Sequence, residues 1–506
     1  MSVPERLRGL PPRVLAAIAV GLVALAVALV LLVRGAGADA SPPADAATRL
    51  VPADALVYVH VSTDRDREST AEAERLARRF PGFDRALKGL AGRLSAPQCG
   101  VDASDVEGKE AGLALLDAGG GQAGSLVLVD TGRDQSKARE RSCGSVQVVG
   151  AGDFLVIGQP QSLQRATDLA AGKGRALATD ALYRAATDGL PAARVLDGWV
   201  TATGVQRLLA PQAGLLGAAG TLLDQPGLRG AAFGVTAEDE GARLTVTSML
   251  DGKRRSGTFK PFTPSMAADV PDEALAYIGL AGLSTATTRL LGAADGGQLS
   301  ALGPLLARAR TALSKQSGGR LDEDLLALFR REVAVAISPA VPAPILTIIA
   351  RTEDEAATRR TLARLQKPLA KILGPAGQPV PVWKELAGGT FQLTPVEGIE
   401  IDYAVFDGKL VLSTRAAGVD AVRAGGGRLA DDDAYRAVHG EAPSEPVTSL
   451  VFLNLDQLLR LGEQTGLNDS KAYLAVKDDL QRVRAIGARS TSDGRQSTAE
   501  LLLSIP

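Results

Sequence analysis

The sequence predicts an α+β fold, in which an N-terminal transmembrane helix is followed by two homologous modules of largely antiparallel sheet with packed helices. A nonapeptide, V-P-A-D-A-L-V-Y-V at residues 51–59, returns as V-P-D-E-A-L-A-Y-I at residues 270–278. The same order of apolar runs and turns follows each copy. Most of these runs come in pairs, with helical segments between them at irregular intervals, which favours antiparallel sheets over a doubly wound parallel sheet.

The composition excludes one large class of partners. The 506 residues include 56 Lys and Arg against 57 Asp and Glu, which gives a formal charge of −1. Binding to a phosphate backbone requires a basic surface, so nucleic acid is not expected as a partner.

The first fifty residues predict a membrane anchor and a tether. Residues 1–13 carry three arginines and one acid, and residues 14–33 carry no charge at all. About twenty helical residues span the roughly 30 Å hydrocarbon core of a bilayer. The positive flank predicts a cytoplasmic N-terminus and an exported remainder, with residues 34–50 as a flexible tether. A cleaved signal peptide is the alternative, but the apolar regions of signal peptides are usually shorter, at about 7–15 residues.

The first module is expected at residues 51–251, and a linker follows at residues 252–269. Short apolar runs rich in β-branched residues predict its strands, and charged or Ala-rich runs predict its helices. The predicted strands are 56–61, 113–116, 126–129, 146–149, 154–157, 195–202, 230–236 and 243–250. The predicted helices are 68–80, 134–141, 162–171 and 204–223.

The second module is expected at residues 270–506. Its predicted strands are 274–278, 333–337, 345–350, 403–406, 409–412, 450–455, 485–490 and 497–505. Asp407 and Gly408 separate two of them and are the residues that a type I′ turn prefers. Thr352 and Glu355 have the spacing of a capping box at the start of a helix.

Cys99 and Cys143 are the only cysteines. In an exported chain this pair predicts a disulfide that closes a loop of about 45 residues and stabilises the fold by roughly 4 kcal/mol. Metal ligation and a catalytic thiol are the alternatives.

No recognisable catalytic or cofactor motif is present. His60 and His439, the only histidines, are expected to be isolated structural or surface residues, and no metal site or cofactor is predicted. The G-x-G-x-x-G match at residues 119–124 joins two predicted strands, so it predicts a hairpin loop rather than a dinucleotide site. The protein is therefore not expected to be an enzyme.

One apolar stripe supports a second functional hypothesis. Its leucines recur at helical spacing: Leu299, Leu302, Leu305, Leu306 and Leu313. They are expected either to pack on the sheet of the second module or to line a groove for a lipid tail or apolar peptide.

The N-terminal span, the tether, the V-P-A-D-A-L-V-Y-V segment and Cys99-Gly100-Val101-Asp102 together resemble a domain-of-unknown-function family of membrane-anchored, exported proteins from high-GC Gram-positive bacteria. The resemblance implies an extracytoplasmic α+β repeat protein and brings no catalytic residues with it.

The expected function is that of a non-catalytic binding or scaffolding ectodomain of the cell envelope. The expected location is the cell membrane, with a single span, the N-terminus in the cytoplasm and the rest of the chain outside. The expected partners are the membrane, through the N-terminal helix, and an envelope protein or lipid. A carrier of a lipid or other apolar ligand is the alternative, and an envelope hydrolase is the third possibility.

Overall fold

The computed structural model describes most of the chain after residue 40. The described residues are 41–64, 66–80, 82, 109–120, 122–132, 140–144, 146–209, 227–251, 260–282, 327–341, 343–375, 377–440 and 445–506. The chain divides into two compact units. The first unit comprises Met1–Arg255, Lys471–Arg482 and Asp493–Pro506, and the second comprises Ser256–Ser470 and Val483–Ser492.

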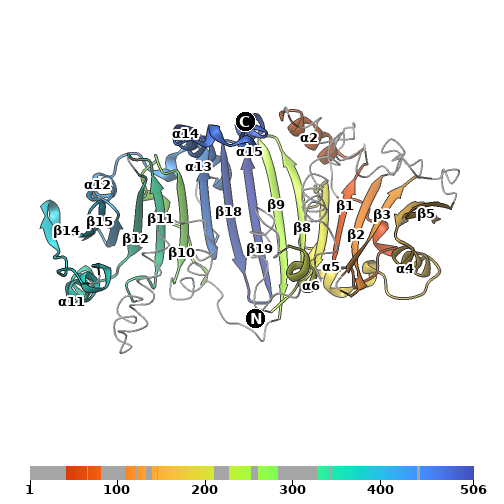
Figure 1. Cartoon of the computed structure of the whole chain (residues 1–506), viewed down its shortest axis with the longest axis horizontal. Coiled ribbons are helices and arrows are strands. Elements are labelled where there is room, and N and C mark those ends of the chain that lie inside the picture. Colours follow the sequence, from red (N-terminus) through yellow and green to blue (C-terminus); the bar gives the residue numbers. More distant parts are fainter. Residues whose placement is uncertain are drawn as a thin grey trace. The chain divides into compact units, whose positions relative to one another are not determined.

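The first unit is built on a sheet in which every described pairing is antiparallel. Its strands are β1 (Val57–Ser62), β2 (Glu110–Gly119), β3 (Gln122–Asp130), β4 (Arg141–Cys143), β5 (Val146–Ala151), β6 (Phe154–Gly158), β7 (Leu196–Thr201), β8 (Leu228–Glu238), β9 (Gly241–Leu250) and β19 (Gln496–Ser504). Their pairings give the spatial order β4-β5-β6-β3-β2-β1-β7-β8-β9-β19. The last strand of the chain, drawn in blue in Figure 1, therefore completes the sheet of the first unit beside β9.

The second unit repeats this order of pairing. Its strands are β10 (Ala276–Ala281), β11 (Glu332–Ser338), β12 (Ile345–Arg351), β13 (Lys384–Leu386), β14 (Thr390–Val396), β15 (Ile399–Phe406), β16 (Lys409–Ser413), β17 (Ser449–Asn454) and β18 (Ala485–Ser492). They pair in the order β13-β14-β15-β16-β12-β11-β10-β17-β18, again antiparallel throughout. Strands β1 and β10 hold equivalent positions: β1 lies between β2 and β7, and β10 lies between β11 and β17.

In the part of the chain that the structure describes, helices are few and mostly short. The α-helices of the first unit are α2 (Glu68–Ala77), α4 (Pro160–Ala170), α5 (Ala181–Thr187), α6 (Ala202–Gly204), α15 (Lys471–Leu474) and α16 (Lys477–Leu480). Those of the second are α11 (Glu355–Leu373), α12 (Ala416–Ala424), α13 (Asp433–His439) and α14 (Leu455–Gln464). A short 3-10 helix, η2 (Ala47–Arg49), precedes β1, and its counterpart η8 (Met266–Ala268) precedes β10.

Strand β1 positions the site described below. Its residues V-Y-V-H-V-S are all buried, because β2 and β7 pair with its two edges and its two faces are covered. Side chains alternate between the faces of a strand, so Tyr58 and His60 point to the same side. Gly112 of β2 makes room there, since a Cβ atom at this position would lie 3.2 Å from the Tyr58 ring.

Local turn chemistry predicts one hairpin correctly and one helix start incorrectly. Asp407 and Gly408 both have positive φ, at 48° and 69°, as the predicted type I′ turn requires. The capping box at Thr352 is wrong. Helix α11 is capped instead by Asp354, whose side chain accepts from the backbone N–H of Ala357, and Glu355 accepts from the N–H of Gly408.

The predicted fold class is also wrong. The described residues form a large antiparallel sheet structure of 19 strands with few helices, instead of α+β modules with packed helices. The apolar runs predicted as strands of four, seven and eight residues extend to ten, eleven and ten residues in β2, β8 and β9, because polar residues that continue each ladder carry no apolar signal. Within the described residues no helix is both long and apolar enough to span a bilayer, and residues 14–33 lie outside that part of the chain.

Candidate functional site

A buried cluster of ionisable side chains centres on His60 of β1. The imidazole is fully buried, and its Nδ1 lies 3.0 Å from Oδ1 of Asp197 on the neighbouring strand β7. Its Nε2 lies 3.5 Å from Oε2 of Glu110, the first residue of β2. Glu110 in turn accepts hydrogen bonds from the backbone N–H groups of Ala46 and Ala47, at 2.9 and 3.2 Å.

Asp45 adds a third carboxylate and two tyrosines to this cluster. Its Oδ1 accepts a hydrogen bond of 2.5 Å from the Tyr58 hydroxyl, and its Oδ2 accepts one of 2.7 Å from the Tyr183 hydroxyl of α5. Carboxylate oxygens of Asp45 and Asp197 and a ring nitrogen of His60 lie within 4.8 Å of one another. Asp45 is the one partly exposed member of this trio.

Arg194 supplies the remaining charge. Its Nε lies 3.3 Å from Oδ1 of Asp197, and its Nη1 donates to the carbonyl of Pro191 at 3.0 Å. Three carboxylates thus meet one guanidinium and one imidazole in a region from which water is largely excluded. Such a network is strongly coupled, since removing one member leaves another charge buried without a partner.

The electrostatics favour a charged imidazole. Burial disfavours the imidazolium, but the carboxylates of Asp45 and Asp197 outweigh burial, so the pKa of His60 lies well above its usual value. Burial raises the pKa of Asp45 against the opposing effect of His60. Burial also acts to raise the pKa of Asp197, yet His60 and Arg194 prevail and that pKa lies below its usual value.

The second unit provides an internal comparison. In the first unit Tyr58 lies opposite Ala114 and Trp199, and in the second Tyr277 lies opposite Ala336 and Phe452. This shared register defines three equivalences around the cluster: His60 with Gly279, Asp197 with Leu450, and Glu110 with Glu332.

Of these three positions, only the one held by Glu110 and Glu332 has the same residue and the same hydrogen bonds in both units. Glu332 accepts from the backbone N–H groups of Ser265 and Met266 at the start of η8, as Glu110 does before η2. Histidine and aspartate are replaced by glycine and leucine. The histidine–aspartate pair of the first unit is therefore not required by the fold.

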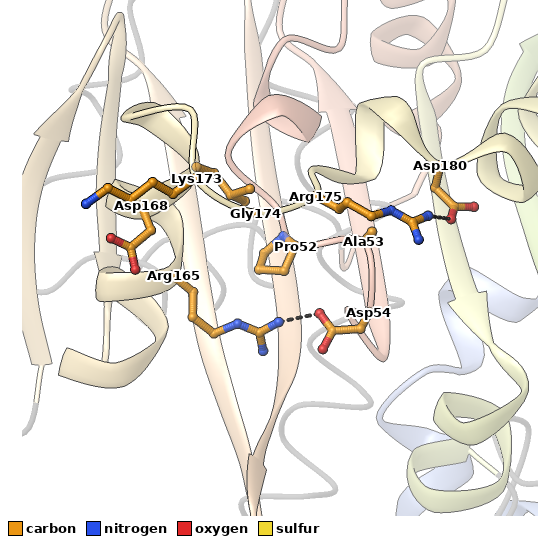
Figure 2. Close-up of a pocket in the computed structure, with 10 residues that line it drawn as sticks. Pro52, Ala53, Asp54, Arg165, Asp168, Lys173, Gly174, Arg175 and Asp180 are labelled. Carbon is orange, nitrogen blue, oxygen red and sulfur yellow. Dashed lines mark hydrogen bonds and ion pairs between the residues drawn. The ribbon is translucent and has the colours of Figure 1, made fainter.

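An open pocket lies on the same unit, close to the repeated V-P-A-D segment (Figure 2). Its volume is about 430 Å³, and its lining residues are Pro52, Ala53, Asp54, Arg165, Asp168, Leu169, Lys173, Gly174, Arg175 and Asp180. Arg165 pairs with Asp54, and Nη2 of Arg175 lies 3.0 Å from Oδ2 of Asp180. Three cationic and three acidic side chains make the lining neutral but highly charged.

The pocket is connected to the buried cluster through α5. Oδ1 of Asp180 accepts from the N–H groups of Leu182 and Tyr183 and so caps this helix, at 2.9 and 3.0 Å. Tyr183 then reaches Asp45.

Most residues predicted as sites lie outside the described part of the chain. This holds for Cys99 and for Leu299, Leu302, Leu305, Leu306 and Leu313, so the disulfide and the apolar groove stay predictions. Cys143 ends β4. His439 is a buried residue of α13 whose Nε2 lies 2.9 Å from the carbonyl of Val451, whereas His60 belongs to the cluster and is not isolated.

No motif in the sequence points to Asp45, Asp197 or Arg194. These residues are far apart in the chain and form no spaced motif. One signal was available: alignment of the two repeats places an aspartate and a histidine in strand positions where the second copy has leucine and glycine.

Comparison with known proteins identifies a family whose function is unknown. A family model described as "Protein of unknown function (DUF3352)" matches residues 127–505. Among curated proteins, no sequence matches the chain.

Two solved structures are similar at low level. "Structure of crystal form I of TP0453" has a TM-score of 0.24 and 10% identity, and the match covers 41% of this chain and 79% of that one. "Structure of crystal form III of TP0453" has the same TM-score and identity, with 40% and 79% covered.

Proposed function

We propose that this chain, which belongs to the DUF3352 family of proteins of unknown function, is a non-catalytic binding protein of the cell envelope that holds a protein partner at the pocket of Figure 2. The observation that carries the proposal is the lining of this pocket. Small-molecule pockets are mostly apolar with a few polar groups, whereas here six of ten lining residues are ionisable.

The charges favour a partner segment that carries both acidic and basic side chains. Arg165 and Arg175 are already paired with aspartates, so the pocket has no excess charge that would concentrate a polyanion. Within the described residues the ammonium group of Lys173 makes no ion pair, and Asp168 accepts only a hydrogen bond of 3.1 Å from Gln164. A partner with both signs of charge can pair with these two side chains and exchange with the existing ion pairs.

The equivalent position of the second unit lacks part of this lining. The backbone N–H of Ala53 donates to the carbonyl of Arg175, and that of Asp272 donates to the carbonyl of Gly427. Arg175 and Gly427 are therefore equivalent, and the arginine is particular to the first unit. The pocket thus distinguishes the first unit from a second unit with the same order of strand pairing.

The envelope location is inferred from the charge pattern of residues 1–33, which lie outside the described residues. The lipid-carrier and hydrolase alternatives have no supporting contact among the described residues. The buried cluster around His60 has only Asp45 partly exposed among its three closest ligand-type residues, which offers a substrate little access.

The test is site-specific photo-crosslinking in cells that produce the full chain. A photoreactive amino acid replaces Ala53 in the pocket or, as the matched control, Asp272 in the second unit. We expect discrete protein adducts at position 53 that are lost in the charge reversals Lys173→Glu and Asp168→Lys. An absence of adducts at position 53, or adducts of equal yield at both positions that ignore the charge reversals, would contradict the proposal.

A further inference from the structure

We propose that Asp45, His60 and Asp197 form a binding site for one divalent transition-metal ion, of which Zn²⁺ is the first to test. One imidazole nitrogen and two carboxylates are ligand types that Zn²⁺ takes together with a water molecule in four-coordinate sites. This metal site does not include any residue that lines the pocket of Figure 2.

The distances fit a shared ion. The three potential ligand atoms all lie within 4.8 Å of one another, and Nδ1 of His60 lies 3.0 Å from Oδ1 of Asp197. Two ligands of one tetrahedral Zn²⁺ ion, each bound at about 2.0–2.2 Å, are roughly 3.4 Å apart. To accept an ion, His60 and Asp197 therefore have to separate slightly, and ligand atoms that lie further apart than this have to approach each other.

The imidazole also has the outer partner that metal-binding histidines need. Its Nε2 is buried and has no hydrogen bond within the described residues, but it faces Oε2 of Glu110 at 3.5 Å. A histidine that binds metal through one nitrogen usually donates its other N–H to a carboxylate. Two backbone N–H groups, from Ala46 and Ala47, hold Glu110 in place for that role.

Asp45 is oriented and accessible. Each of its oxygens accepts one tyrosine hydroxyl, which leaves a second lone pair on each for an ion. Because Asp45 is partly exposed while His60 and Asp197 are buried, an ion can enter from its side.

The charge count points to a divalent cation. Once the imidazole has released its proton to bind a metal, the carboxylates of Asp45, Glu110 and Asp197 exceed the single guanidinium of Arg194 by two negative charges. One divalent ion neutralises this excess. In the second unit Gly279 and Leu450 replace His60 and Asp197, so no such excess arises there.

The experiment uses the full chain, from which a chelator has removed any bound metal. Isothermal titration calorimetry with ZnCl₂ measures the affinity, and inductively coupled plasma mass spectrometry measures the number of zinc ions bound per chain. We expect one ion per chain and a higher midpoint of thermal unfolding. The double variant His60→Gly/Asp197→Leu, which installs the residues of the second unit, should lose at least 100-fold in affinity. The variant Glu110→Gln should lose 10- to 100-fold, the usual effect of an outer partner.

Two control variants and one further ligand variant complete the experiment. His439→Gln and the double variant Cys99→Ser/Cys143→Ser remove the other histidine and both cysteines, and they should bind Zn²⁺ as the unchanged protein does. Asp45→Asn changes a partly exposed ligand and serves if the glycine–leucine variant does not fold. The proposal is overturned if the unchanged chain binds no Zn²⁺, or if folded Asp45→Asn or His60→Gly/Asp197→Leu protein binds it with unchanged affinity.

Discussion

The Nδ1 atom of His60 lies 3.0 Å from Oδ1 of Asp197, a residue 137 positions further along the chain, and both side chains are buried. The pair is formed by two neighbouring strands, β1 and β7, whose register places the residues directly opposite each other. The equivalent positions of β10 and β17 hold glycine and leucine.

The variant Asp197→Leu should destabilise the metal-free protein by about 3–5 kcal/mol, because it leaves the charges of His60 and Arg194 buried without their carboxylate. In the double variant His60→Gly/Asp197→Leu one of these orphaned charges is gone. The two effects should therefore be non-additive by at least about 1 kcal/mol. Urea unfolding of both single variants and the double variant measures this coupling energy, and strict additivity would show that the pair does not interact.

The variants Tyr58→Phe and Tyr183→Phe should each cost about 1–3 kcal/mol, since each removes a hydroxyl that donates to Asp45. Tyr277→Phe is the matched control in the second unit. The buried hydroxyl of Tyr277 has no hydrogen-bond partner among the described residues, so its removal should be neutral or slightly stabilising. Unfolding measured under the same conditions should show Tyr58→Phe and Tyr183→Phe to be less stable than Tyr277→Phe. A loss at Tyr277 as large as that at Tyr58 would contradict the assignment.

The variant Asp402→Asn should stabilise the protein at alkaline pH. Burial, aided by the negative charges of Glu400 and Asp420, raises the pKa of Asp402 to about 6. A carboxyl group with a raised pKa in the folded state stabilises the fold below its unfolded pKa of 3.8, and this contribution is lost as the pH rises through 6.

Between pH 4 and pH 8, the free energy of unfolding of Asp402→Asn should rise by about 2–3 kcal/mol relative to that of the unchanged chain. Thermal or urea unfolding of Asp402→Asn and the unchanged chain across this range tests the prediction. Parallel stability curves would refute it.

His439 should give the opposite pH dependence. Burial, with a further contribution from Arg489, lowers its pKa to about 4 although the Val451 carbonyl favours the charged form. A histidine with a lowered pKa stabilises the fold above its unfolded pKa of 6.5, and this contribution is lost as the pH falls through 4.

In the variant His439→Gln, whose amide can still donate to the Val451 carbonyl, the loss of stability between these two pH values should shrink by about 3 kcal/mol. If the variant and the unchanged chain lose the same stability between pH 7 and pH 3.5, the pKa of His439 is not lowered in the folded protein.

Short apolar runs rich in β-branched residues predict much of the local structure. Residues 56–61 correspond to β1, and the hairpin at Asp407 and Gly408 has the predicted turn. The fold class is missed because short apolar runs do not record how far a ladder extends. In β2, Asp117 continues the strand although it is exposed, because it pairs with Ala123 of β3.

The two candidate sites depend on contacts between distant parts of the chain. The repeated V-P-A-D segment supplies one wall of the pocket, but the pocket also needs Arg165 and Arg175, which helix α4 and the segment after it bring to Asp54 and Asp180. The buried cluster needs residues from β1, β2, β7, α5 and the segment before η2. No spacing within the sequence encodes such a meeting.

The amino-acid sequence by itself determined the repeated segment, the balanced charge, most strand positions and the membership of a family of unknown function, because these depend on composition and on neighbours in the chain. The tertiary structure alone decided the sheet order, the return of the last strand to the first unit and the meeting of Asp45, His60 and Asp197. The physical reason is that strand register and packing act between residues more than a hundred positions apart, where hydrogen-bond pairing and burial, rather than local propensity, select the contacts.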